Sequence, residues 1–165
     1  MRRSQVQQVF IYILGMIIVS FILLYGYKSV KVFKERSDTT MLIKFRSGTV
    51  SMIKQISSDH GTVRQKILDI PPGFKEICFV DSGFDPGLPP DGFGRDHPII
   101  LNLLNDGVKA NIFLVDEVAK EYIYAGDDDK SYVKTDPSPF LCLSGEKVRL
   151  RIEGKGDHAV ISQWT

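Results

Sequence analysis

"VFIYILGMIIVSFILLY", residues 9–25, decides the architecture of this 165-residue chain. These 17 residues carry no charge, and only Gly15 and Ser20 interrupt the run of large apolar side chains. With Gly26 and Tyr27, the segment approaches the ~20 residues that a helix needs to cross about 30 Å of hydrocarbon. We therefore expect residues 9–27 to form a transmembrane helix, preceded by a short basic tail at residues 1–8.

Aromatic residues mark both edges of this apolar segment. Tyr12 lies near its start, and Tyr25 and Tyr27 lie at its end. Tyrosine rings favour the headgroup zone of a bilayer because one end of the ring is apolar and the other is polar. A core helix of a soluble protein is a competing interpretation, but the chain holds no second apolar segment long enough to cover it. The edges therefore favour a lipid bilayer as the partner of the segment.

A removable signal peptide is a second alternative for the same segment. The apolar core of a signal peptide usually has about 7–15 residues and ends in a cleavage site of small residues. Here the segment is longer and continues as "YGYKSVKVFKER", residues 25–36, which holds no such site. We therefore expect the segment to be retained as an anchor.

Charge is distributed unevenly along the chain. Residues 1–36 hold six basic residues and one acidic residue, whereas the remaining 129 hold 15 basic and 19 acidic residues. A positive collar around an apolar segment suits anionic lipid headgroups. The acidic remainder argues against nucleic acid as a partner, because a nucleic-acid surface needs clustered Lys and Arg. Basic residues lie on both sides of the segment, so charge alone leaves its orientation open.

The N-terminus, "RRSQVQQVF" at residues 2–10, resembles that of archaeal type IV pilin-like proteins. Their pattern is a basic segment, a small residue and then Gln-x-Ser-x-Glu-Phe, which Gln5 and Phe10 match. Ser4 stands where the family has Gly or Ala, and Val9 stands where it has an acidic residue. The resemblance implies cleavage between Ser4 and Gln5 and assembly into a filament. The missing carboxylate implies a minor or priming subunit, or one that does not assemble.

The layout of the whole chain is similar to that of uncharacterised single-span archaeal membrane proteins. These share a basic start with glutamines, a "CFVD" strand, here within residues 77–81, and a late "GKG" turn, here residues 154–156. The resemblance implies a cell-surface protein in the cytoplasmic membrane. The pilin-like N-terminus and the cysteine pair described below favour an extracytoplasmic C-terminal domain. Other copies of the chain, or other membrane or envelope proteins, are the partners that the resemblance implies besides the bilayer.

Residues 28–59 are expected to form a helical stem. Apolar residues recur there at steps of three and four, as on one face of a helix. Gly48 weakens a helix by ~1 kcal/mol relative to Ala. A break at Gly48 is one alternative to a continuous helix, and a β-hairpin that turns at "RSG", residues 46–48, is another. The apolar stripe consists of Leu42, Phe45, Met52, Ile53 and Ile56.

Residues 60–165 are expected to form an α+β head domain, with about seven short strands packed on one or two helices. Residues 83–98, "GFDPGLPPDGFGRDHP", hold Pro or Gly at eight of sixteen positions and are expected to form an exposed loop. A short helix is expected at residues 97–107, because Pro98 suits a first turn and Gly107 a stop. The expected strands are residues 62–70, 74–82, 110–116, 121–127, 139–144, 147–154 and 158–164.

The two cysteines of the chain, Cys78 and Cys142, both lie in apolar strand patterns. On neighbouring strands in an oxidising compartment they would form a disulfide, which would add a few kcal/mol to the stability of the fold. The alternative is a pair of buried thiols that pack as small apolar groups. Neither cysteine lies in a CxxC motif or beside a histidine in the sequence, so the sequence gives no sign of zinc or of redox catalysis.

Aspartates in and next to the Pro- and Gly-rich loop are weak candidates for a calcium site, because calcium accepts oxygen ligands from flexible loops. Their spacing differs from that of an EF-hand loop, and aspartate is also a common turn residue. These residues are Asp81, Asp85, Asp91 and Asp96.

Other catalytic or metal-binding motifs are lacking in the sequence. His60, His97 and His158 are scattered, and no serine lies in a Gly-x-Ser-x-Gly motif. We expect no cofactor and a structural or interaction role for a single-pass membrane-anchored protein. The alternatives are a pilin-like filament subunit and a membrane-tethered calcium-binding or hydrolase domain.

Overall fold

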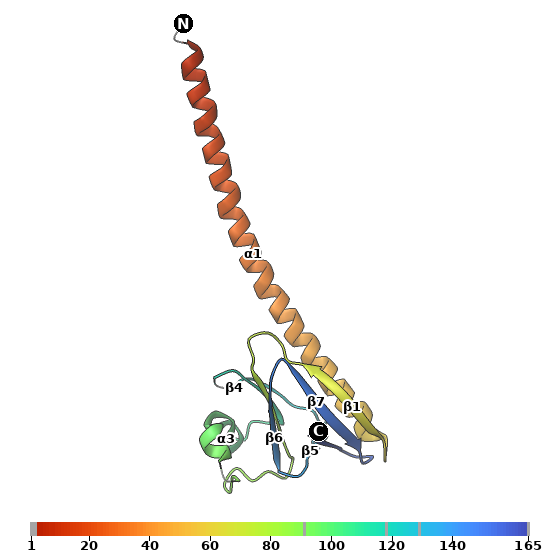
Figure 1. The fold of residues 1–165 in the computed structure, drawn as a ribbon. Coiled ribbons are helices and arrows are strands. Elements are labelled where there is room, and N and C mark those ends of the chain that lie inside the picture. The colour runs from red at the N-terminus through yellow and green to blue at the C-terminus, as the bar shows by residue number, and fades with distance from the viewer. Residues whose placement is uncertain (1–2, 91, 118, 129, 165) are drawn as a thin grey trace. The chain divides into compact units, whose positions relative to one another are not determined.

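The computed structural model describes residues 3–90, 92–117, 119–128 and 130–164. It confirms the α+β class, with a long apolar helix followed by a β-rich domain (Figure 1). The helix, α1, spans Arg3–Ser58. The chain divides into two compact units, Met1–Met41 and Leu42–Thr165.

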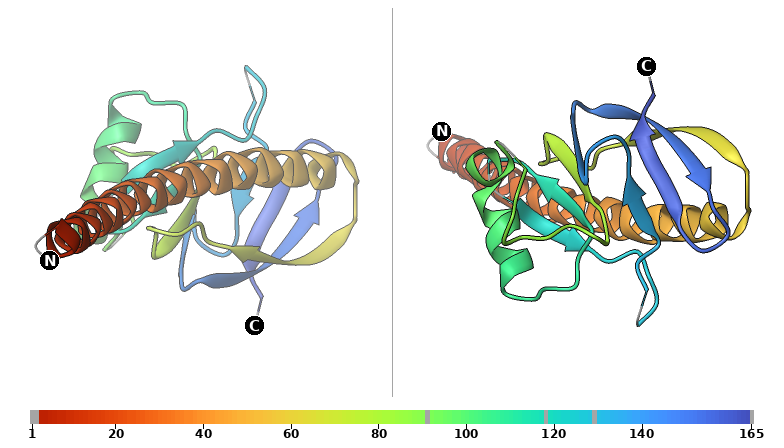
Figure 2. Two further views of the ribbon diagram at one scale, coloured as in Figure 1. Left: turned by 90° about the horizontal axis from the view of Figure 1, so that it is seen from above. Right: turned by 90° about the horizontal axis from the view of Figure 1, so that it is seen from below.

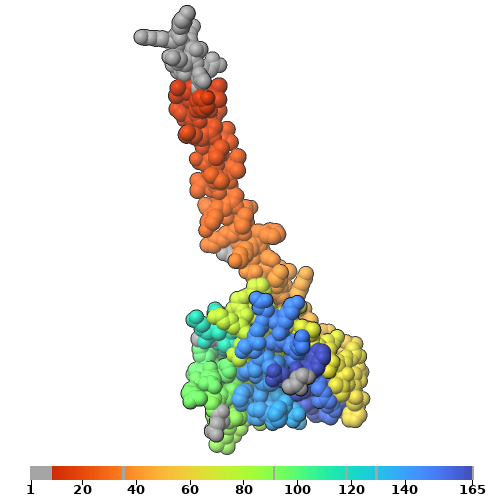
Figure 3. All heavy atoms as spheres, in the orientation of Figure 1, coloured from red at the N-terminus to blue at the C-terminus, as the bar shows by residue number. Residues whose placement is uncertain are grey.

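The first unit is the N-terminal part of α1. Its large apolar side chains, from Val9 to Phe33, are exposed. Figure 3 draws all atoms of this stretch, in red and orange. Within the described residues, α1 is the one helix long and apolar enough to cross a membrane, and none of its most apolar stretch is buried. A surface of this composition gains free energy when hydrocarbon rather than water surrounds it.

The second unit begins inside α1 at Leu42, well before the expected domain boundary at residue 60. From here the helix packs its apolar stripe on the head domain, with Ile53 and Ile56 fully buried. The helix has no break at Gly48, and the hairpin alternative is wrong. Gly48 lies on the exposed side of α1, and burial of the stripe outweighs its low helix propensity.

Eight strands among the described residues form two four-stranded sheets. The first sheet has the order β1-β7-β8-β5, and the second has the order β4-β3-β2-β6. All neighbours are antiparallel except β5 and β8, which are parallel. The strands are β1 (Val63–Asp69), β2 (Glu76–Val80), β3 (Ile112–Val115), β4 (Ala119–Ile123), β5 (Val133–Thr135), β6 (Phe140–Ser144), β7 (Lys147–Gly154) and β8 (Ala159–Gln163).

The second sheet separates two apolar cores. Alternation along β2 places Ile77 and Phe79 in the larger core, which the first sheet and the end of α1 also line. Cys78 and Val80 point to the opposite face and belong to a smaller core under α2 (Phe93–Asp96) and α3 (Pro98–Asn105). In both Figure 1 and Figure 2, α3 and β1 lie on opposite sides of the head domain.

The Pro- and Gly-rich segment differs from the exposed loop that its composition predicts. It contains α2, and Phe93 is only 1% exposed. The Phe93 ring lies 5.2 Å from that of Phe84 and 4.5 Å from that of Phe140, measured between centroids. Two aromatic residues in this segment bury enough apolar surface to order it, which a count of Pro and Gly does not register.

The short strand β5 is also absent from the expected set. Its three residues pair with β8, and this partner supplies the hydrogen bonds that define it as a strand. Three residues are too few for a periodic pattern in the sequence.

Candidate functional site

The candidate site lies on the face of the second sheet that the smaller core covers. In the antiparallel pair β2–β6, Cys78 is directly opposite Cys142, and Glu76 is directly opposite Ser144. Side chains alternate along a strand, so Glu76 and Cys78 share one face with Cys142 and Ser144. The sheet register therefore gathers a carboxylate, two sulfurs and a hydroxyl at one end of two neighbouring strands.

Cys78 and Cys142 are joined by a disulfide, with an S–S distance of 2.03 Å. Cys78 is fully buried, whereas Cys142 is partly exposed. The bond closes a 64-residue separation and cross-links β2 to β6. The sequence left two alternatives for this pair, a disulfide or two buried thiols, and the structure has the disulfide.

His97 brings an imidazole to this disulfide from a different part of the chain. It lies between α2 and α3, and its backbone N–H donates to the carbonyl oxygen of Phe93 at 2.8 Å. Its Nε2 lies 4.0 Å from the Cys78 sulfur and 3.9 Å from a carboxylate oxygen of Glu76. The side chains of His97 and Glu76 are 14% and 21% exposed, so the ring and the carboxylate meet in a half-buried site.

Glu76 is itself held by β6. The Ser144 hydroxyl donates to Oε1 of Glu76 at 3.2 Å, which leaves Oε2 facing His97. One potential ligand atom from each of Glu76, Cys78, His97 and Cys142 lies within 4.8 Å of all the others. We call these four residues the ECHC cluster. A cavity of about 50 Å³, lined in part by His97, Val115 and Ala119, lies beside it.

The chemistry available to the ECHC cluster depends on the redox state of its cysteines. A carboxylate and an imidazole are both metal ligands, and thiolates are a third class that favours zinc and other borderline-soft ions. A disulfide offers no thiolate. The oxidised cluster therefore serves as a covalent link between two strands.

The aspartates of the sequence hypothesis do not converge in this way. Among the described residues, the one group of converging ligands is the ECHC cluster, and Asp81, Asp85 and Asp96 are outside it. Asp81 accepts the backbone N–H groups of Gly83 at 2.6 Å and of Thr135 at 3.2 Å. Asp85 accepts that of Gly87 at 2.8 Å.

The contacts to Gly83 and Gly87, each two residues further along the chain, are those of turn-forming aspartates, whereas the contact to Thr135 joins Asp81 to β5. Asp96 forms an ion pair with the neighbouring Arg95 at 3.4 Å. Asp91 lies outside the described residues.

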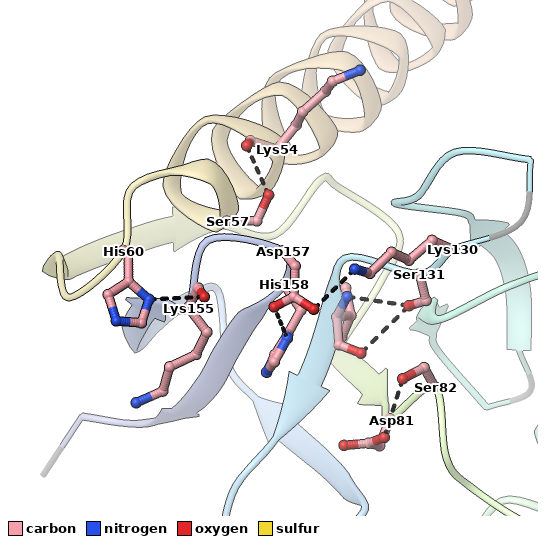
Figure 4. Close-up of polar contacts among 11 residues, drawn as sticks. Lys54, Ser57, His60, Asp81, Ser82, Lys130, Ser131, Lys155, Asp157 and His158 are labelled. Carbon is pink, nitrogen blue, oxygen red and sulfur yellow. Dashed lines mark hydrogen bonds and ion pairs between the residues drawn. The ribbon is translucent and has the colours of Figure 1, made fainter.

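The other two histidines lie in a separate group of polar contacts near the end of α1 (Figure 4). His60 Nδ1 lies 2.9 Å from the Lys155 carbonyl oxygen, and His158 Nδ1 lies 2.5 Å from a carboxylate oxygen of Asp157. Hydrogen bonds from Lys130 and His158 lower the pKa of Asp157 from 3.8 to about 2. These contacts link the β7–β8 turn to its neighbours.

A second carboxylate with a lowered pKa, Asp116, lies just after β3. It forms ion pairs with Lys120 at 2.7 Å and Lys75 at 2.8 Å. Hydrogen bonds from these two ammonium groups lower the pKa of Asp116 from 3.8 to about 2. Both lysines are on the surface, so the group acts as a link between the start of β2 and the β3–β4 turn.

Sequence reasoning missed two members of the ECHC cluster. Glu76 lies two residues before Cys78, and strand alternation alone would have placed both on one face. His97 gave no comparable signal, because a turn between α2 and α3 delivers it and no spacing rule relates it to either cysteine.

The chain matches no model of a protein family, no curated protein and no solved structure.

Proposed function

We propose that this chain is a single-pass membrane-anchored protein with an extracytoplasmic head and a structural or interaction role. Residues 9–27 would span the cytoplasmic membrane, and the domain that starts at Leu42 would present a folded surface to a partner. The observation that carries the proposal is the apolar stretch of α1, whose side chains are exposed from Val9 to Phe33. The free energy of exposing such apolar side chains to water is unfavourable, and transfer into the hydrocarbon of a bilayer removes this cost.

The disulfide supports an extracytoplasmic side for the head. Disulfides form and persist mainly in oxidising compartments, while cytosolic thiols are kept reduced. The Cys78–Cys142 bond joins residues on two paired strands of the second sheet, β2 and the edge strand β6, rather than on an exposed loop. A head built around this bond suits the outer face of the membrane.

Membrane fractionation tests the anchor. The full chain should sediment with membranes and stay there after an alkaline carbonate wash, which removes peripheral proteins. Replacing Ile17 and Phe21 together with Arg should move a large share of the protein to the wash, because each charge at the centre of a span costs about 2.5–3.5 kcal/mol. Wild-type protein released by carbonate would contradict the proposal.

A matched pair of substitutions controls for added charge. Ile67 and Leu88 are exposed apolar residues of the head, at 56% and 80%. Replacing both with Arg adds the same charge outside the proposed span. This variant should stay in the membrane pellet like the wild type.

A second candidate function is that of a pilin-like filament subunit. It is favoured by the continuity of α1, which leads from Arg3 to Ser58 without a break and directly into a β-rich domain. That layout is the one expected from the resemblance of the N-terminus to pilin-like proteins. The intact mass of the native protein tests it: a chain that starts at Gln5 supports processing, and one that starts at Met1 excludes it.

A further inference from the structure

The ECHC cluster has the composition of a zinc site, although its two sulfurs are joined in a disulfide. Zinc in proteins takes four ligands from Cys, His, Asp and Glu in a tetrahedral arrangement. The cluster supplies two sulfurs, one imidazole nitrogen and one carboxylate oxygen within 4.8 Å of one another. We propose that the reduced form of this protein binds one zinc ion through Glu76, Cys78, His97 and Cys142.

The distances suit this proposal. In a tetrahedral zinc site, the ligand atoms lie about 3.3–3.8 Å from one another, given bond lengths of about 2.0–2.3 Å. His97 Nε2 already lies 4.0 Å from the Cys78 sulfur and 3.9 Å from Oε2 of Glu76. Once the S–S bond is broken, rotation of the cysteine side chains separates the sulfurs without a change in the register of β2 and β6.

The surroundings of the cluster also fit a metal site. Ligands of a metal site are commonly oriented by hydrogen bonds from a second layer of groups. Glu76 is oriented by the Ser144 hydroxyl, and the His97 ring packs on Phe93 with centroids 5.5 Å apart. A cavity of about 50 Å³ lies beside His97, which is the one member of the cluster that lines it.

The redox step balances as a thiol–disulfide exchange followed by metal binding. A dithiol reductant gives two electrons and two protons to the Cys78–Cys142 bond and becomes a disulfide itself, which leaves two thiols on the protein. Zn²⁺ then binds as these thiols release two protons. The ion is held by two thiolates, the neutral imidazole of His97 and the carboxylate of Glu76.

As a consequence, the oxidised site and the reduced, zinc-bound site would link different sets of elements in the head. The disulfide links β2 to β6. Zinc would link the same strands and also the turn between α2 and α3, because His97 belongs to that turn. The inference concerns the head alone and holds whether or not the chain spans a membrane.

Metal titration of the full chain in detergent tests the proposal. The protein is stripped with a chelator, reduced anaerobically with a phosphine, freed of small molecules and titrated with zinc against a chromophoric chelator. We expect one zinc ion per reduced chain. Cobalt(II) in place of zinc should give the thiolate charge-transfer absorption and the intense visible bands of a tetrahedral site. The unreduced protein should show neither, because it has no thiolate.

Single substitutions identify the ligands. Loss of an outer-layer group typically lowers metal affinity 10–100-fold, so we expect His97→Gln and Glu76→Gln, which remove direct ligands, to lower zinc affinity by more than about 100-fold. His60→Gln and Glu146→Gln are the matched controls outside the cluster and should bind zinc like the wild type. Circular dichroism of each variant checks that the fold is kept.

Three results would overturn the proposal. The first is reduced wild-type protein that keeps its fold and takes up no zinc. The second is zinc binding that His97→Gln and Glu76→Gln leave unchanged. The third is equal binding by oxidised and reduced protein, because that would place the metal away from the two sulfurs.

Discussion

Nε2 of His97 lies 4.0 Å from the sulfur of Cys78, although the two residues are 19 positions apart and the chain between them is rich in Pro and Gly. The contact depends on Phe93, whose buried ring anchors α2 in the smaller core one turn before His97. An ordered turn thus delivers an imidazole to the disulfide and to Glu76. This contact distinguishes the Cys78–Cys142 pair from a disulfide that only closes a loop.

The disulfide is expected to stabilise the head. A cross-link over a 64-residue separation restricts the unfolded chain, and such bonds typically contribute about 2–4 kcal/mol. Replacing both cysteines with Ala should lower the free energy of unfolding by that amount. Denaturant titration in detergent measures it through the fluorescence of Trp164, the only tryptophan, which lies in the head. A variant as stable as the oxidised wild type would show that the bond adds nothing.

Gly154 is expected to be irreplaceable for a steric reason. A side chain at this position would overlap the backbone carbonyl oxygens of Ile56 and Asp59 at the end of α1. Neither oxygen can move freely, so Gly154→Ala should destabilise the head by about 3 kcal/mol or more. Thermal unfolding of the two proteins measures the difference.

Gly48→Ala is the matched control for that substitution. A Cβ at Gly48 meets nothing within 4 Å, and the residue lies inside α1 on its exposed side. This change should stabilise the protein by about 1 kcal/mol through helix propensity. Effects of the same sign at the two glycines would contradict the packing of β7 against the end of α1.

Asn111 is expected to be the most sensitive polar residue of the head. Its buried amide donates to the Ala125 carbonyl oxygen at 2.9 Å and to the Ser131 hydroxyl at 2.8 Å, and it accepts the Ala125 N–H at 2.8 Å. Asn111→Ala leaves these groups without partners and should cost about 3 kcal/mol of stability. Asn102→Ala, on the exposed face of α3, should change stability by less than about 0.5 kcal/mol. Equal effects of the two changes would contradict this role.

Stability should fall in strong acid because of Asp116. Its pKa is lowered from 3.8 to about 2 by hydrogen bonds from Lys120 and Lys75. A carboxyl with a lowered pKa in the folded state stabilises the fold above its ordinary pKa, and that contribution is lost as pH falls through the folded value. Asp116→Asn should therefore reduce the loss of melting temperature between about pH 4 and pH 2.

Lys120→Gln offers an independent check on the same ion pair. It removes the closer of the two ammonium groups while it leaves Asp116 ionisable. The acid-induced loss of melting temperature should shrink in this variant as well. Profiles of both variants that coincide with the wild-type profile would assign the acid sensitivity to other groups.

Much of the fold follows from local patterns in the sequence. Val148, Leu150 and Ile152 alternate with exposed residues, and this pattern predicts β7, while the apolar run at residues 9–25 predicts the N-terminal helix. Short elements that depend on tertiary contacts were not predictable. β5 exists as a strand because β8 pairs with it, and α2 is ordered by the burial of Phe93.

Only part of the ECHC cluster could be predicted from the sequence. The two cysteines were recognisable as a pair because both lie in apolar strand patterns, and their register on β2 and β6 places them opposite each other. His97 reaches them through the turn between α2 and α3, whose direction depends on packing far from either cysteine. Long-range contacts of this kind leave no trace in residue spacing.

The central claim is that the head lies on the extracytoplasmic side of the membrane. One labelling measurement tests it most directly. Leu88 is 80% exposed in the head, and both native cysteines are held in a disulfide. A Leu88→Cys variant therefore offers one reactive thiol, with the wild type as its control. We predict that a membrane-impermeant maleimide labels Leu88→Cys on intact cells and leaves the wild type unlabelled. Labelling of the variant only after the membrane is permeabilised would place the head in the cytoplasm and contradict the proposed orientation.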